Sequence, residues 1–146
     1  MYIVKKKAVN IADIQSNSQS FGGRIRTTRI SANLTIRELA FLAGLSPEAI
    51  SMIENGANCP SLPTLRKLSE CLSKPIWYLG CFEDMPEDTL GDRVKKARYY
   101  HGYFIEEAAK HLRVDPRSLT NWEKNRTTTS NKYINQVNEF ISILYR

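Results

Sequence analysis

A chain of 146 residues, 42% of them hydrophobic and 25% charged, is long enough for one ordinary globular domain or two small ones, so folding is expected. The net charge of +6 favours a polyanionic partner, although charge alone identifies none. The longest apolar run, at 75–82, is far too short to cross a bilayer, and the N-terminus lacks an apolar signal core. We therefore expect neither a membrane span nor a signal peptide, and a cytoplasmic location.

The cysteines and histidines give no sign of metal binding. Cys59, Cys71 and Cys81 form no C-x-x-C pair, and His101 and His111 are not spaced like zinc ligands beside them. We expect reduced, partly buried thiols and histidines on helix surfaces. No nucleophile and base set or glycine-rich phosphate loop occurs either. The sequence therefore predicts no enzyme, and no metal, cofactor or small-molecule substrate.

Residues 1–20 differ in composition from the rest of the chain. Three consecutive lysines, Lys5, Lys6 and Lys7, precede a segment rich in serine, asparagine and glutamine with few large apolar residues. We expect a mobile basic arm. Its lysines suit either the phosphates or minor groove of a nucleic acid or simple solvation, and the sequence leaves both open.

The chain contains an internal duplication at an offset of 69 residues, which holds without a gap from Phe21/Leu90 to Ser61/Ser130. It predicts two domains, 21–82 and 90–146, joined by an acidic linker at 83–89. The identical pairs fall at helix starts and apolar positions: Gly22/Gly91, Arg24/Arg93, Arg29/Arg98, Ile36/Ile105, Glu38/Glu107, Ala40/Ala109, Pro47/Pro116, Glu54/Glu123 and Ser61/Ser130.

The first copy is predicted to consist of short helices. Thr35 followed by Glu38 is a capping box, and Ser46 before Pro47 is an N-cap followed by a proline at the first helical position. Glycine ends a helix where the left-handed conformation is needed, as at Gly44. The expected helices are approximately 22–32, 35–44, 46–56, 61–72 and 75–79.

The second copy repeats the first three helices and then departs. Asp115 is the expected N-cap before Pro116, and Asn125 replaces the glycine that ends the equivalent helix, since asparagine tolerates the left-handed region. A last helix is expected at about 131–145. Its apolar stripe, Tyr133, Val137, Phe140 and Leu144, is wide enough to pair two chains. No hairpin signal occurs, so we predict an all-α fold of two tandem small helical bundles.

The helix beginning at Pro116 has one apolar and one polar side. At 100° per residue, Leu119, Trp122 and Glu123 share a side that can pack inward. The opposite side carries Arg117, Thr120, Asn121 and Lys124. Arginine matches the guanine edge and asparagine the adenine edge, while lysine and arginine also suit phosphates. This pattern is typical of a helix that lies in a DNA major groove, although a solvated polar face would look similar.

The segment TIRELAFLAGLSPEAISMIENGANCPSLPTLRKLSECL resembles the helix-turn-helix family of Cro and phage repressors, also called the xenobiotic-response-element family. The resemblance covers about 22–79. LGDRVKKARYYHGYFIEEAAKHLRVDPRSLTNWEKNR extends it to 90–142, mainly through Arg98, Trp122 and Glu123. The matching positions of the first copy are Glu38, Ala40, Gly44, Ser46, Ile50, Ser51, Glu54, Gly56, Pro60 and Ser61.

The resemblance implies a lambda-repressor-like DNA-binding domain of five helices, with the third helix of each copy as the reader. It also implies ion pairs between Arg29 and Glu54 and between Arg98 and Glu123, both 25 residues apart. A glutamine that touches phosphate in this family is replaced by isoleucine, Ile36 and Ile105. The expected DNA-binding residues are Arg117, Ser118, Thr120, Asn121, Lys124 and Arg126 in the second copy, and Glu48, Ala49, Ser51, Met52, Asn55 and Asn58 in the first.

The two copies are unequal as DNA readers. The first copy presents Glu48 and Met52 outward, and a carboxylate is repelled by phosphates. Residues 85–146 carry 11 basic and 8 acidic side chains, whereas residues 20–84 carry 7 and 6. We predict a sequence-specific regulator of transcription, a repressor, that binds double-stranded DNA as a single chain or a homodimer. The alternative is a protein-interaction module whose first copy docks a protein partner.

Overall fold

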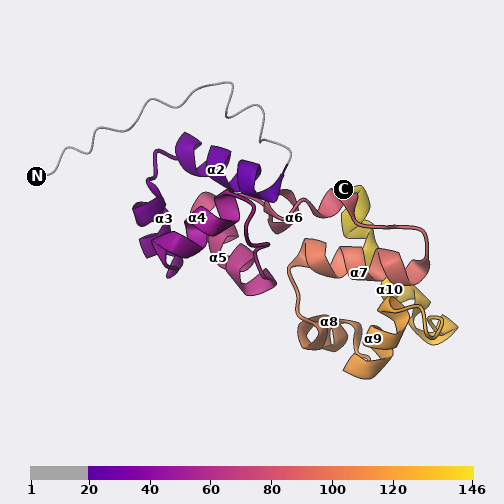
Figure 1. Cartoon of the computed structure of the whole chain (residues 1–146). Helices are drawn as coiled ribbons and strands as arrows, with labels where there is room; N and C mark the ends of the chain where they lie inside the picture. The colour runs from indigo at the N-terminus through magenta and orange to yellow at the C-terminus, as the bar shows by residue number, and fades with distance from the viewer. Residues whose placement is uncertain (1–19) are drawn as a thin grey trace, which may run out of the picture. The chain divides into compact units, whose positions relative to one another are not determined.

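The computed structural model describes residues 20–146, which form α-helices and short 3-10 helices with no strand among them (Figure 1). The predicted all-α fold class is therefore confirmed. The predicted arm with its lysine run falls on residues 1–19, outside the described residues. No helix in the described part is long and apolar enough to cross a bilayer. The chain forms two compact units that divide between Cys59 and Pro60.

The first unit is a bundle of three short helices whose starts are set by local capping. Ser20, Thr35 and Ser46 each accept a hydrogen bond from a backbone N–H in the first turn of the helix that follows. Its buried apolar side chains are Ile25, Leu39, Ala40, Ala43, Ile50 and Ile53. The helices are α2 (Phe21–Ser31), α3 (Ile36–Ala43) and α4 (Pro47–Glu54).

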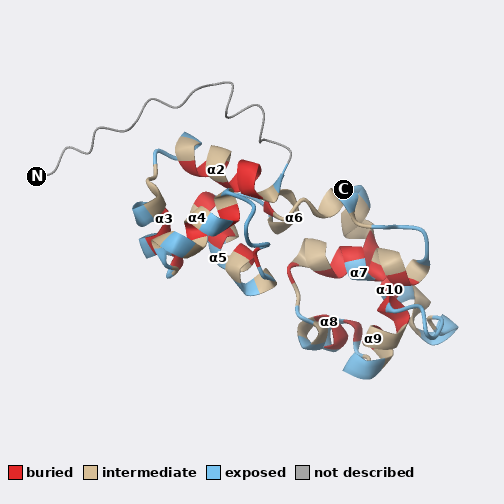
Figure 2. Ribbon diagram, in the orientation of Figure 1, coloured by how far each residue is buried: buried red, intermediate tan, exposed pale blue. Residues whose placement is uncertain are grey.

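The second unit has its own apolar core, built from α7 to α10 around the fully buried Val94, Leu119 and Val137. In Figure 2 the red, buried stretches of α7 and α10 face the interior of this unit. Its elements are α5 (Leu62–Leu72), α6 (Ile76–Leu79), the 3-10 helix η1 (Phe82–Asp84), α7 (Leu90–His101), α8 (Ile105–Leu112), α9 (Pro116–Glu123), η2 (Asn131–Tyr133), α10 (Ile134–Ile141) and η3 (Ser142–Tyr145).

The sequence repeat is also a repeat of structure. The starts of α7, α8 and α9 lie 69 residues after those of α2, α3 and α4. Asn125 has a φ of 57°, and Gly56 at the equivalent position of the first copy has a φ of 78°. The prediction that asparagine takes the left-handed place of the glycine is therefore confirmed.

The predicted linker packs as part of the second unit. Lys96 is only 5% exposed, and its ammonium group donates to the Glu83 carbonyl at 2.8 Å and to the Glu87 carboxylate at 2.7 Å. The Trp77 ring of α6 stacks on Tyr100 of α7, with 5.6 Å between ring centroids. Because of these contacts the observed units divide earlier along the chain than the predicted domains, 21–82 and 90–146, which remain a prediction.

The C-terminal segment differs in detail from the single helix expected at about 131–145. It begins as η2, continues as α10 and ends as η3. Its stripe faces inward, since Val137 and Phe140 are 0% and 2% exposed and belong to the core of the second unit. Tyr133 and Leu144 pack against the same core. A second chain would therefore have to use another surface.

Two expectations about single residues need correction. His101, expected on the surface, is half-buried: its ring stacks on Phe140 at 4.4 Å between centroids and its Nε2 lies 3.0 Å from the Phe140 carbonyl. The three cysteines are reduced thiols, as expected, but Cys59 is exposed, and only Cys71 and Cys81 are partly buried.

Candidate nucleic-acid interface

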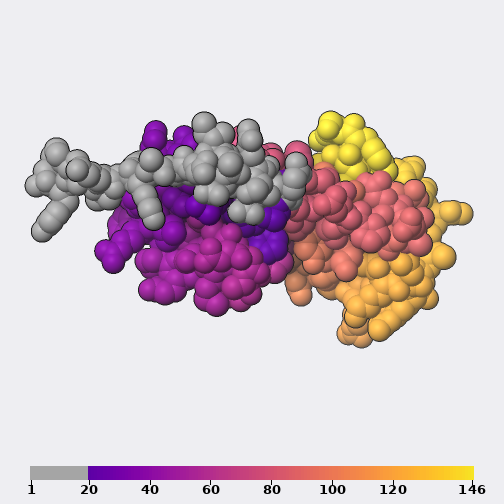
Figure 3. All heavy atoms as spheres, turned by 45° about the horizontal axis from the view of Figure 1, so that its top comes forward, coloured from indigo at the N-terminus to yellow at the C-terminus, as the bar shows by residue number. Residues whose placement is uncertain are grey.

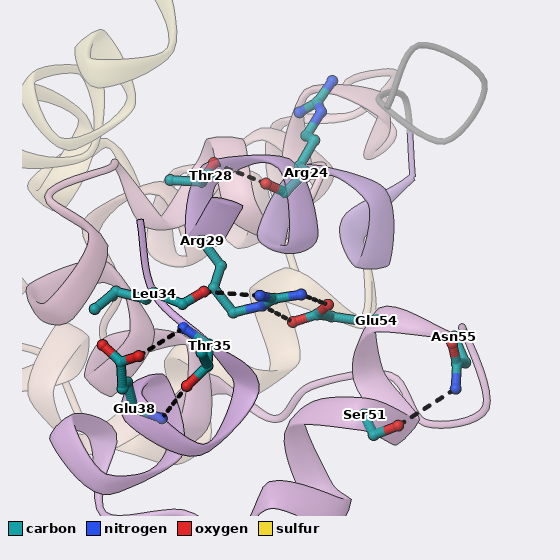
Figure 4. A network of polar contacts seen from close by, with 9 residues as sticks. All are labelled: Arg24, Thr28, Arg29, Leu34, Thr35, Glu38, Ser51, Glu54 and Asn55. Carbon is teal, nitrogen blue, oxygen red and sulfur yellow. Dashed lines mark hydrogen bonds and ion pairs between the residues drawn. The ribbon is translucent and has the colours of Figure 1, made fainter. Parts of the chain in front are cut away.

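Each candidate reading helix is fixed to the first helix of its copy by a buried ion pair. In the first copy Arg29 donates through Nε and Nη2 to the two Glu54 oxygens at 2.7 and 2.8 Å, and through Nη1 to the Leu34 carbonyl at 2.8 Å (Figure 4). The side chains of Arg29 and Glu54 are only 10% and 4% exposed. The two hydrogen bonds from the guanidinium satisfy both carboxylate oxygens, as the burial of a charged pair requires.

The same arrangement recurs 69 residues later. Arg98 donates to Glu123 through Nε and Nη2 at 2.8 and 2.9 Å, and through Nη1 to the Tyr103 carbonyl at 3.0 Å. Burial lowers the pKa of Arg98, but the hydrogen bond and the charge of Glu123 outweigh burial and raise it above its ordinary value. Both ion pairs predicted from the sequence are therefore present in the structure.

A glycine lets the two helices of each pair approach closely. A Cβ at Gly22 would lie 2.5 Å from the Ile53 carbonyl oxygen, and a Cβ at Gly91 would lie 2.0 Å from that of Trp122. Real Cβ atoms do not come so close to backbone oxygens, so only glycine fits. The glycine and the ion pair of each copy together fix the position of α4 against α2 and of α9 against α7.

The outward face of α9 is polar, as predicted. Leu119 and Trp122 are 0% and 5% exposed and point into the core, while Arg117 is exposed and Asn121 half-buried on the other side. In Figure 3 the orange atoms around residue 120 are in view at the surface. The remaining candidate residues of this copy are the half-buried Ser118 and Thr120 and the exposed Lys124 and Arg126.

Lys124 and Arg126 lie beyond the last helical residue of α9. The Lys124 N–H donates to the Thr120 carbonyl at 3.0 Å, and the Arg126 N–H donates to the Asn121 carbonyl at 2.9 Å. These bonds hold the turn after α9 against the helix end. Two cations therefore follow directly on the polar face that carries Arg117.

The outward face of α4 in the first copy has different chemistry. Glu48 and Met52 are exposed, the latter by 42%, while Ile50 and Ile53 are buried beneath them, as predicted. In Figure 2 the pale blue exposed stretches mark the outer side of this helix. The other candidate residues of this copy are the half-buried Ala49 and Ser51 and the exposed Asn55 and Asn58.

The structure places one further basic residue, Arg26, beside the candidate DNA-binding residues of the first copy; sequence reasoning did not single it out. Its side chain lines a pocket of about 200 Å³ between α2, α3 and α4, together with Ser51 and Asn55. The 69-residue repeat contained a signal that points to this position, because the equivalent residue of the second copy, Lys95, is also basic.

Clusters of histidine, cysteine, aspartate and glutamate suited to a metal ion do not occur among residues 20–146. The arrangement is instead a pair of helices joined by a short turn. The later helix of the pair has an outward polar face and is fixed on its inner side by an ion pair. That is the helix-turn-helix arrangement, in which the second helix of the pair enters the major groove. The fold and site therefore define a DNA-binding class of protein.

Comparison with known proteins agrees with this class. Residues 25–78 match the helix-turn-helix family. A stretch of 92 residues is 34% identical to the HTH-type transcriptional repressor RghR of Bacillus subtilis strain 168 and covers 56% of this chain and 68% of that protein. A stretch of 73 residues is 36% identical to the uncharacterized HTH-type transcriptional regulator RghRB of the same strain and covers 47% of this chain and 52% of that protein.

The chain therefore belongs to the helix-turn-helix family of transcriptional regulators, of the Cro and phage-repressor type that the sequence resembles. The family match covers the first copy, whereas the second copy is supported by the internal repeat and by the recurrence of its helices and ion pair. No solved structure matches the chain significantly.

Proposed function

We propose that this chain is a repressor that reads a specific double-stranded DNA sequence through α9 and, less strongly, through α4. The main support comes from Arg117 and Asn121, which share the outward face of α9. Neither side chain hydrogen-bonds to any other residue in the described part of the chain. Arginine can donate two parallel bonds to guanine O6 and N7, and asparagine can pair with adenine N6 and N7. Since they are four residues apart, the two side chains reach neighbouring base pairs from one face.

The phosphate contacts of the second copy come from the cations beside this face. Lys124 and Arg126 are exposed after the end of α9, and residues 85–146 carry three more basic than acidic side chains. Such contacts position a protein on the duplex, while the base contacts choose the sequence. The same division of roles is proposed here.

Repression is proposed from the name of the relative RghR, a transcriptional repressor. Each copy reads one half-site, and half-sites on one face of the duplex lie about one helical turn, roughly 34 Å, apart. Two copies in one chain supply two readers, and a homodimer supplies four, which sedimentation of the chain with its duplex would distinguish. The proposal includes a cytoplasmic location, because the regulator must reach its DNA, and it includes no catalytic step.

The test is selection of duplexes from a randomised pool by the full chain, followed by gel shift of the enriched duplex. Arg117→Ala and Asn121→Ala are expected to weaken specific binding by about 1–3 kcal/mol for each lost bidentate contact, with unchanged folding. Asn135→Ala, at an exposed position on α10, makes the same chemical change away from the reader and should bind like the unaltered chain. Unchanged affinity and selectivity in both reader variants would remove the second copy as the reader.

A protein partner for the first copy is the second candidate. It is favoured by the exposure of large apolar side chains in the first unit, where Phe41, Leu42 and Met52 are 86%, 57% and 42% exposed. The dependence of binding on salt concentration distinguishes the two functions. Binding to phosphates weakens steeply between low and physiological ionic strength, whereas a contact centred on Met52 and Phe41 should hardly respond.

A further inference from the structure

The pocket between α2, α3 and α4 is lined by side chains that suit an anion. It has a volume of about 200 Å³, and its lining residues are Arg26, Arg29, Ile36, Ser51, Glu54 and Asn55. We call it the α2–α4 pocket. All six residues belong to the first unit, so the pocket is complete within that unit.

The charge of the α2–α4 pocket comes from Arg26. Both oxygens of the only lining carboxylate, Glu54, are held by Arg29 at 2.7 and 2.8 Å, so that pair is neutral as a whole. Among the residues that the structure describes, none makes a hydrogen bond or an ion pair with the Arg26 guanidinium. One uncompensated positive charge therefore faces the pocket.

Two neutral donors complete the lining. Ser51 of α4 and Asn55, the C-cap residue directly after α4, lie one turn apart, and Figure 4 shows their side chains directed toward each other. The Asn55 amide approaches the Ser51 oxygen at 3.5 Å, a long contact, so the serine hydroxyl hydrogen and an amide hydrogen remain for a ligand. Ile36 offers only hydrocarbon. A guanidinium, a hydroxyl and an amide are the donors that proteins direct at phosphate oxygens.

The same combination recurs in the second copy, which is an independent observation. Sixty-nine residues after Arg26, Ser51 and Asn55 the chain has Lys95, Thr120 and Lys124. A cation on the first helix and a hydroxyl on the third are kept, and the amide becomes a second cation. The structural ion pair behind these positions is also kept. Donor groups that recur at equivalent positions of both copies are better explained by a shared ligand than by packing.

We propose that the α2–α4 pocket binds one backbone phosphate of the DNA, clamped by Arg26, Ser51 and Asn55. This inference rests on the proposed DNA-binding function. It gives the first copy, whose outward face carries Glu48, a sequence-independent contact with the duplex. The first copy, which reads bases less strongly, thereby gains a contact that positions it on the duplex, and Lys95 makes the corresponding contact in the second copy.

The experiment measures binding of the full chain to a fluorescent mixed-sequence duplex of about 40 base pairs from low to physiological salt. Each phosphate contact contributes about 0.9 to the slope of log affinity against log salt, so Arg26→Ala is expected to reduce the slope by about that amount. Arg26→Gln, which keeps the length of the side chain, should reduce it equally, and Arg26→Lys should restore it. Circular dichroism and urea midpoints show that the variants are folded.

The matched comparison is Arg37→Ala, which removes an exposed arginine of the same unit outside the pocket. An equal effect of Arg37→Ala and Arg26→Ala would mean that only overall charge matters, and it would overturn the clamp. Ser51→Ala removes no charge, and it is expected to weaken binding severalfold at every salt concentration. Unchanged binding of Ser51→Ala would also count against the clamp.

A second arm separates DNA phosphate from free phosphate. Inorganic phosphate is titrated against the chain while the Arg26 side-chain nitrogen is followed by NMR. A response to inorganic phosphate with no effect of Arg26→Ala on duplex binding would make the pocket a free-anion site and overturn the proposal. If the unaltered chain bound no duplex, the proposed function itself would fail. If it bound and Arg26→Ala had the same affinity and slope, only this inference would fail.

Discussion

Arg98 of α7 holds Glu123 of α9 with two parallel hydrogen bonds of 2.8 and 2.9 Å, and both side chains are less than a tenth exposed. The pair is therefore the link between the helix that builds the core and the helix that carries the polar face. Water screens its attraction less than that of an exposed pair, because both charges are buried. The same relationship joins Arg29 to Glu54 in the first copy.

Removing one partner of this pair should destabilise the second unit strongly. Glu123→Ala leaves the Arg98 guanidinium buried without its carboxylate, and a cost of about 3–5 kcal/mol in the free energy of unfolding is expected. Urea unfolding monitored by tryptophan fluorescence measures it.

The exposed pair of Arg66 and Glu107 is the matched control. Their atoms also approach to 2.7 Å, but both side chains are more than a third exposed, at 39% and 38%. Arg66→Ala is therefore expected to cost only about 1 kcal/mol or less. Equal losses in Arg66→Ala and Glu123→Ala would mean that burial does not set the strength of the Arg98 pair.

Gly91→Ala should be costly although alanine favours helices. Its Cβ would lie 2.0 Å from the Trp122 carbonyl oxygen, so α7 and α9 would have to separate. A loss of about 1–3 kcal/mol is expected, as for other overpacked sites, together with weaker DNA binding because α9 is displaced. Lys95→Ala, on the exposed side of the same helix, should change stability by at most about 0.5 kcal/mol. A stability gain in Gly91→Ala would contradict the close crossing of the two helices.

Local chemistry explains why much of this fold was predictable from the sequence. The capping residues Thr35, Ser46 and Asp115 act within three residues of themselves, so their helix starts could be inferred without knowledge of the fold. The partners of each ion pair are 25 residues apart in the sequence, but the duplication presented the same arginine–glutamate spacing twice. The repeat and the family resemblance together identified the ion pairs, which the spacing in one copy alone would not have done.

The features that sequence reasoning missed depend on helices meeting in space. His101 is half-buried because the Phe140 ring, 39 residues away, stacks on it. The α2–α4 pocket needs three helices to bring Arg26 next to Ser51. The attachment of the acidic segment to α7 depends on the contacts of Lys96 with Glu83 and Glu87, which the linker-like composition of that segment does not indicate.

Asn125 should be replaced better by glycine than by alanine. Its φ of 57° is left-handed, and its side chain accepts from the Thr89 hydroxyl at 2.8 Å and donates to Asp92 at 3.3 Å. Both substitutions lose these bonds, but only alanine also has the steric cost of the left-handed region, so Asn125→Ala should be less stable than Asn125→Gly by about 1–2 kcal/mol. Thermal unfolding of both variants measures the difference, and the reverse order would exclude a left-handed residue here.

Stability of the second unit should fall as the pH is lowered through the histidine range, because of His101. Burial is the largest cause that lowers the pKa of His101 below its ordinary value of 6.5; the nearby His111 and Arg146 lower it further, and the contact with the Phe140 carbonyl opposes them. The folded state therefore binds a proton less readily than the unfolded state. Its contribution to stability is complete above pH 6.5 and is lost as the pH falls from there to the lowered pKa.

His101→Gln removes this titration and should flatten the decline of stability between pH 7.5 and pH 5. Urea midpoints measured at several pH values in this window give the two slopes. His111→Gln is the control, since His111 is exposed and His101 stays half-buried without it. That variant should retain most of the slope. If His101→Gln kept the full slope, other groups would have to carry the pH dependence, and the half-buried ring would not act as a titrating group in folding.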